Sequence, residues 1–112
     1  MTQTRSPLFV VGCPRSGTTL LRLMLDSHPS LAIPPESHFI PKLARRYGTG
    51  VVDSGAVAHE VVATQTFAAW GLDPRAALEG ASGSTFAEVI GSIFATYAEA
   101  HGKSRWGDKT PA

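Results

Sequence analysis

The chain contains little charge and almost no cysteine. Of its 112 residues 17% are charged, and 10 Lys and Arg against 9 Asp and Glu leave a formal net charge of +1. So small a net charge argues against nucleic-acid binding through a broad basic surface. The single cysteine, Cys13, excludes an internal disulfide and a zinc site built from several cysteines.

Long apolar runs and metal-ligand clusters are also missing from the sequence. The first apolar run begins at Leu8 and stops at Gly12, too short for a secretory signal or a membrane span. Polar residues interrupt the later apolar stretches. We therefore expect a cytoplasmic protein without a metal ion.

Hydrophobic residues make up 43% of the chain, which is typical of a folded protein. A chain of this length has room for one domain, 1–112, and buries about two-thirds of its unfolded surface. The run Leu8–Val11 is short, apolar and partly β-branched, as in a strand buried on both faces. A polar loop follows over 12–19, and then a dense apolar stretch to about Asp26 predicts a mostly buried helix.

The rest of the chain alternates short strands and helices. The clearest helix is predicted over 84–101, with one apolar stripe, a capping box at Thr85 and Glu88, and a stop at Gly102. The other expected elements are a strand at 31–33, helices within 36–47, 56–70 and 74–78, and a strand at 105–107 that leads into a polar loop at 108–111. This order indicates an α/β fold, a parallel sheet flanked by helices.

The segment Gly12–Thr19 lies between the first strand and the first helix, where a glycine turn favours anion binding. It matches the nucleotide-binding P-loop pattern at Gly12, Gly17 and Thr19, but Thr18 stands where the P-loop lysine is expected. That lysine reaches the β- and γ-phosphates, so its absence argues against ATP or GTP hydrolysis. Arg15 supplies a positive charge within the loop instead. The alternative is a strand-to-helix turn that binds no ligand.

The run Pro14–Leu21, preceded by Leu8–Gly12, resembles the 5′-phosphosulfate loop of sulfotransferases that use 3′-phosphoadenosine 5′-phosphosulfate (PAPS). With Leu25–Pro29 it is similar to tyrosylprotein sulfotransferases and their bacterial relatives. The resemblance extends to about Lys42 and resumes at Trp106–Pro111. It implies a P-loop NTPase-like fold and PAPS as co-substrate, with 3′-phosphoadenosine 5′-phosphate as product.

The resemblance also implies roles for matched positions. Arg15 would contact the bridging oxygen and the sulfonate, and Lys109 would add positive charge there. Glu36 lies 21 residues after Arg15, as the catalytic glutamate does in the tyrosylprotein enzymes, and would be the general base. His38 would bind the acceptor, or act as the base if Glu36 does not. The 5′-phosphate would be bound by Pro14, Arg15, Ser16, Gly17, Thr18 and Thr19.

The acceptor stays open at this point. Pro35 replaces an acidic residue of the tyrosylprotein enzymes, so a sugar, lipid, small alcohol, phenol or peptide could supply the hydroxyl or amine. Glu36 could instead cap the next helix or form a surface ion pair, and Lys109 could be a solvated loop lysine.

Two other functions are compatible with the sequence, a P-loop-type nucleotide- or phosphate-binding kinase and a non-catalytic fragment that retains the phosphate loop. In the resembling family, the segments that bind the 3′-phosphate lie beyond the matched motifs. We therefore expect a truncated N-terminal part, with an incomplete sheet, an exposed strand edge and an incomplete PAPS site; whether this chain is active alone stays open.

Overall fold

A parallel three-stranded sheet forms the centre of the fold. The computed structural model describes residues 7–12 and 18–111. Strands β1 (Leu8–Gly12), β2 (Leu31–Ala32) and β3 (Arg105–Pro111) are arranged in the order β1-β3-β2, and both pairs are parallel. The last strand in sequence therefore lies between the first two. The predicted α/β fold with a parallel sheet is confirmed.

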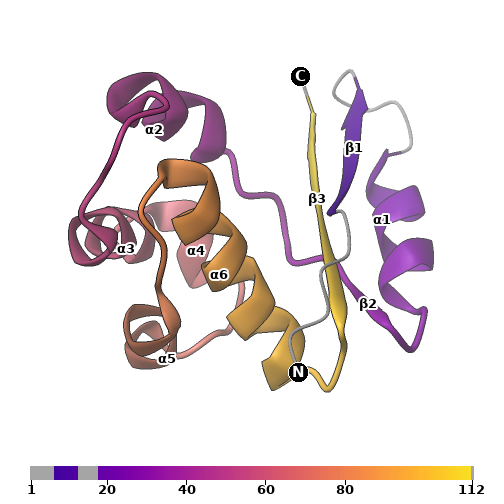
Figure 1. Ribbon diagram of the computed structural model, residues 1–112. Helices are drawn as coiled ribbons and strands as arrows, with labels where there is room; N and C mark the ends of the chain where they lie inside the picture. Colours follow the sequence, from indigo (N-terminus) through magenta and orange to yellow (C-terminus); the bar gives the residue numbers. More distant parts are fainter. Residues whose placement is uncertain (1–6, 13–17, 112) are drawn as a thin grey trace.

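Helices cover the two faces of the sheet unequally (Figure 1). Helix α1 (Thr18–Asp26) lies on one face and contacts all three strands. The other face carries a helical layer in which α6 contacts β2 and β3. This layer consists of α2 (Ile40–Tyr47), α3 (Ser54–Val62), α4 (Gln65–Ala68), α5 (Pro74–Gly80) and α6 (Phe86–Ala100).

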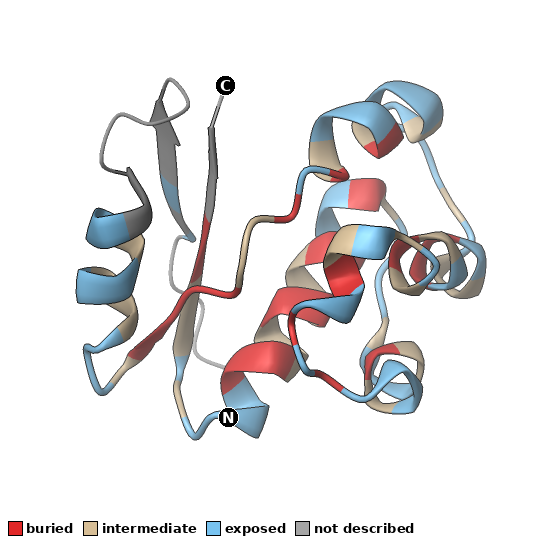
Figure 2. Ribbon diagram, turned by 180° about the vertical axis from the view of Figure 1, so that it is seen from behind, coloured by how far each residue is buried: buried red, intermediate tan, exposed pale blue. Residues whose placement is uncertain are grey.

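The hydrophobic core lies mainly within the helical layer, where the buried residues gather (Figure 2), and α6 contributes seven of them. The predicted apolar stripe and the capping box of Thr85 and Glu88 are both present in α6. Trp70 packs edge-on against Phe94 and Tyr97, with ring centroids 4.9 and 5.5 Å apart. Buried aromatic rings of this kind contribute large apolar areas to folding.

One predicted helix is wrong in extent. The stretch predicted as a single helix over 56–70 is two helices, because α3 ends at Val62 and α4 begins at Gln65. Thr64 separates them: its hydroxyl donates to the carbonyl of Val61 at 2.7 Å and accepts from the amide of Phe67. A threonine that caps a new helix in this way competes with continuation of the previous one.

The expectation that the first helix is mostly buried is also wrong. Four large apolar side chains of α1 are 43–64% exposed, while Arg22 and Asp26 are partly buried against the rest of the fold. The apolar density of the stretch did not show which side of the helix would face the sheet. The four exposed side chains are Leu20, Leu21, Leu23 and Met24.

Candidate functional site

The predicted phosphate loop connects β1 to α1. Strand β1 ends at Gly12 and α1 begins at Thr18, so Thr18 and Thr19 are the first two residues of that helix. The first turn of α1 contains no acidic residue, which leaves the positive end of the helix dipole unopposed within the helix. The start of α1, which follows the loop, is therefore favourable for binding an anion. Pro14, Arg15, Ser16 and Gly17 lie outside the described residues, and their roles stay predictions.

Lys109 lies in a strand and not in the predicted loop. Its backbone pairs with Val10, and two positions later Pro111 pairs with Gly12. The prediction of a loop at 108–111 is wrong because the polar residues continue the pairing of β3 with β1. This register brings Lys109 close to the start of the phosphate loop.

Glu36 and His38 form a pair. Glu36 Oε2 lies 2.8 Å from His38 Nε2, with the two side chains 30% and 48% exposed. His38 has a φ of 57°, a left-handed backbone that is uncommon outside glycine. The N-cap position of α2 is Phe39, whose side chain makes no capping hydrogen bond. The two candidate bases are thus in contact with each other.

Ser37 connects this pair to the sheet. Its side chain is fully buried, and its hydroxyl donates to Asp108 Oδ2 at 3.2 Å. Thr66 donates its hydroxyl to the carbonyl of Ser37 at 2.6 Å, which fixes the segment on its other side. Asp108 pairs with Phe9 in the sheet and directly precedes Lys109. The segment of Glu36 and His38 is therefore anchored to β3 at the residue before Lys109.

Sequence reasoning missed Ser37 and Asp108 as site residues. Asp108 had a signal, because it lies in Trp106–Pro111, where the family resemblance resumes, but that resemblance implied a role only for Lys109. Ser37 had none, since a serine between two polar residues predicts an exposed loop position.

An apolar cavity of about 750 Å³ lies between the sheet, α2 and α6. Its lining includes the aromatic rings of Phe9 and Trp106, which meet edge-on with centroids 6.1 Å apart. Ile40, the first residue of α2, also lines it and follows His38 by two positions. Neither Glu36 nor His38 is among the lining residues, so the cavity is linked to that pair only through the start of α2.

Across the described ranges, 7–12 and 18–111, no three His, Cys, Asp or Glu side chains gather as a metal site would need. No helix of the same part of the chain has the length and apolar character to cross a membrane.

Known proteins resemble this chain in two ways. The chain is 50% identical over 36 residues to protein-tyrosine sulfotransferase 1 of Homo sapiens, which is 32% of this chain and 10% of that protein. The chain is also 50% identical over 36 residues to the protein-tyrosine sulfotransferase of Drosophila melanogaster, and this match covers 7% of that protein. The chain thus matches a tenth or less of these curated relatives.

A solved structure, the sulfotransferase domain from the curacin biosynthetic pathway, is 27% identical with a TM-score of 0.48, and covers 96% of this chain and 39% of that one. The model of the sulfotransferase family matches residues 7–112, nearly the whole chain. The chain therefore belongs to the sulfotransferase family.

Proposed function

We propose that this chain forms part of an enzyme that transfers a sulfonate group from PAPS to an acceptor hydroxyl or amine. One observation carries the proposal: three segments far apart in sequence meet along the paired strands β1 and β3. They are the start of the phosphate loop at Gly12, Lys109 opposite Val10, and the Glu36–His38 pair anchored through Ser37 to Asp108. Parallel α/β sheets bind ligands at the carboxyl ends of their strands, and β1 ends at Gly12, where the phosphate loop begins.

The residues divide the work by charge. Gly17, Thr18 and Thr19 would hold the 5′-phosphate with backbone N–H groups and hydroxyls at the start of α1, and Pro14 and Ser16 would shape the loop. Arg15 and Lys109 would neutralise the negative charge that spreads over the sulfonate oxygens. Bound PAPS supplies the sulfonate, and the protein contributes positioning and preorganised positive groups.

Glu36 would accept the proton of the acceptor. As the acceptor oxygen or nitrogen bonds to sulfur, the bond between sulfur and the oxygen of the 5′-phosphate breaks, and the acceptor proton passes to the Glu36 carboxylate. The contact between Glu36 Oε2 and His38 Nε2 supports this role, because it orients the carboxylate. His38 would also contact the acceptor.

The acceptor class stays as broad as a hydroxyl or an amine. Two of the similar proteins are named for tyrosine, whose hydroxyl sits on an apolar ring, and the apolar cavity next to α2 suits an acceptor of that character. A sugar, lipid, alcohol, phenol or peptide remains within this proposal. The cytoplasmic location also stays a prediction, to be checked by fractionation of cells that express the protein.

Nucleotide selectivity tests the proposal. Calorimetry of the whole protein should show tighter binding of 3′-phosphoadenosine 5′-phosphate than of ADP or ATP. Equal affinity for the three nucleotides would contradict PAPS as the donor, and ATP turnover with Mg²⁺ would favour the kinase alternative. Replacing Arg15 with Ala should abolish transfer from PAPS without unfolding the protein.

A further inference from the structure

We infer that Arg22 and Asp26 are positioning residues that set the place of Glu36 relative to the phosphate-binding end of α1. This inference rests on the proposed function for its catalytic meaning, but its contacts stand independently. Both side chains project from α1 at positions four apart, so they lie on one side of the helix. We call the two residues and their contacts with the backbone of 33–34 the α1 clamp.

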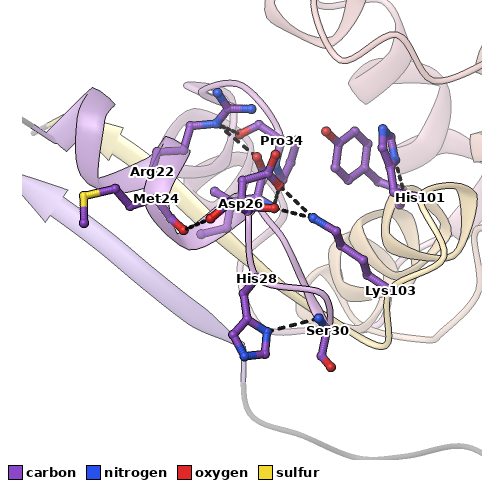
Figure 3. Close-up of polar contacts among 11 residues, drawn as sticks. Arg22, Met24, Asp26, His28, Ser30, Pro34, His101 and Lys103 are labelled. Carbon is purple, nitrogen blue, oxygen red and sulfur yellow. Dashed lines mark hydrogen bonds and ion pairs between the residues drawn. The ribbon is translucent and has the colours of Figure 1, made fainter.

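The clamp binds the chain just after β2 (Figure 3). Arg22 Nε donates to the carbonyls of Ile33 and Pro34 at 3.0 and 3.1 Å. Asp26 Oδ1 accepts from the amide of Ile33 at 2.8 Å. Both backbone polar groups of Ile33 therefore bind side chains of α1.

Among the strands that the structure describes, none pairs with the clamped segment, which explains why it needs these side chains. Strand β2 ends at Ala32, while Ile33 and Pro34 are fully buried. Buried backbone groups outside a sheet or helix destabilise the fold unless other donors and acceptors satisfy them. Arg22 and Asp26 provide those partners, so the segment is fixed to α1.

Lys103 holds the clamp in place from the turn between α6 and β3. Its ammonium donates to the carbonyl of Asp26 and lies 3.7 Å from Asp26 Oδ1, and its side chain is only 17% exposed. Burial raises the pKa of the nearby Tyr97, and the Asp26 carboxylate raises it further. A charged, partly buried network of this kind loses its geometry when one member is removed.

The α1 clamp lies between the predicted phosphate-binding residues and Glu36, and this position is the basis of its proposed role. Arg22 lies one helical turn after Thr18, the predicted phosphate-binding residue at which α1 begins, and Pro34 lies two residues before Glu36. On its other side Glu36 is followed by Ser37, which binds Asp108 of β3. Glu36 is thus held between an anchor on α1 and an anchor on β3. A displacement of about 1 Å in such a geometry can lower a rate about 100-fold.

Turnover measured with two acceptor substrates distinguishes a misplaced general base from a general loss of structure. Arg22→Met should lower kcat about 10- to 100-fold for an acceptor with a neutral hydroxyl, with the KM for PAPS within about twofold. For a phenol that is already ionised at the assay pH, which needs no base, the loss should be much smaller. Equal losses with the two acceptors, or no loss with either, would overturn the inference.

Matched variants isolate the hydrogen bonds. Asp26→Asn keeps an Oδ1 acceptor for the Ile33 amide and should retain most of the turnover, whereas Asp26→Leu should behave as Arg22→Met does. Arg46→Met removes an arginine whose partner is Glu60 on α3. This control variant should leave kcat unchanged with both acceptors. If Asp26→Asn and Asp26→Leu lose turnover equally, the hydrogen bond to Ile33 has no positioning role.

Amide hydrogen exchange gives a readout that needs no turnover. Arg22→Met should speed exchange at Ile33 and Glu36–Phe39 about 10-fold or more, while amides of α6 keep their protection. Unchanged exchange in this segment would overturn the clamp. If the wild-type protein transfers no sulfonate, the proposed function fails, and the exchange experiment still decides whether α1 holds the segment.

Discussion

Ser37 and Asp108 lie 71 positions apart in sequence, and the Ser37 hydroxyl donates to Asp108 Oδ2 at 3.2 Å in the interior. Asp108 is 7% exposed and Ser37 is fully buried. A buried carboxylate is stable only with hydrogen-bond donors around it, so this contact contributes to stability as well as to the placement of Glu36.

Removing the Ser37 hydroxyl should destabilise the protein. Ser37→Ala deprives the buried Asp108 carboxylate of one donor, and we expect the free energy of unfolding to fall by about 1.5 to 3 kcal/mol. Urea denaturation measures the change. The exposed Ser104→Ala is the control and should stay within about 0.5 kcal/mol of wild type. Equal stability of the two variants would show that the Ser37 bond contributes little.

Replacing Glu36 should affect turnover and spare nucleotide binding. Glu36→Gln removes the proton acceptor but keeps the shape, so kcat should fall about 100- to 10,000-fold with unchanged affinity for 3′-phosphoadenosine 5′-phosphate. His38→Gln keeps a donor near the former Nε2 and should lose less activity than His38→Ala. A larger loss in His38→Ala than in Glu36→Gln would identify His38 as the base.

Lys109 should contribute to turnover through its charge. Its backbone pairs with Val10, close to the start of the phosphate loop, and removal of one positive group near a developing negative charge costs about 100- to 1,000-fold in kcat. Lys109→Met tests this in steady-state kinetics. Lys42→Met, on the exposed side of α2, is the matched control. A Lys109→Met enzyme as fast as its control would make Lys109 a solvated lysine.

Stability should decrease in acid partly through Glu60. A hydrogen bond from the Tyr47 hydroxyl, at 2.8 Å, and then the Arg46 guanidinium hold the pKa of Glu60 below its ordinary value. A lowered pKa stabilises the fold above the unfolded-state pKa, and this contribution is lost as the pH falls from about 5 toward about 3.

Glu60→Gln should therefore show a smaller drop in melting temperature over that pH range than wild type. Glu99→Gln changes an exposed carboxylate near the end of α6 and should keep the wild-type slope. An acid slope that is identical in wild type and Glu60→Gln would contradict a stabilising role for the Tyr47 and Arg46 contacts.

The start of α6 should be sensitive to loss of its cap. Thr85 accepts from the amide of Glu88, so Thr85→Ala should lower the free energy of unfolding by about 1 kcal/mol. Thr85→Ser keeps the hydroxyl and should lose much less. The difference between the two variants in the free energy of unfolding, measured by urea denaturation, gives the contribution of the cap. Equal values would show that the threonine methyl group, and not the hydroxyl, causes the loss.

Local patterns in the sequence predicted α6 well. Its apolar stripe, capping box and terminal glycine act within one or two turns, so they need no distant partner. The predicted start of α5 at residue 74 was confirmed for the same reason. The helix predicted over 56–70 was too long because a threonine such as Thr64 can either continue a helix or cap the next one.

Long-range geometry could not be predicted from these patterns. The polar residues 108–111 suggested a loop because nothing local showed that β3 would lie beside β1. The exposed side of α1 could not be recognised either. Four large apolar side chains within two helical turns suggest burial, and nothing local showed which of them would face away from the sheet. Ser37, Asp108 and Arg22 were missed because each acts through a partner distant in sequence.

The sequence by itself determined the strand-loop-helix order around Gly12–Thr19, the candidate residues Glu36, His38 and Lys109, and the family that these motifs indicate. Only the tertiary structure decided that Glu36 contacts His38, that Ser37 joins them to β3, and that Arg22 holds the preceding residues to α1. The reason is physical: helix propensity and capping act between neighbours in the chain, whereas parallel strand pairing and buried hydrogen bonds form only when distant segments meet.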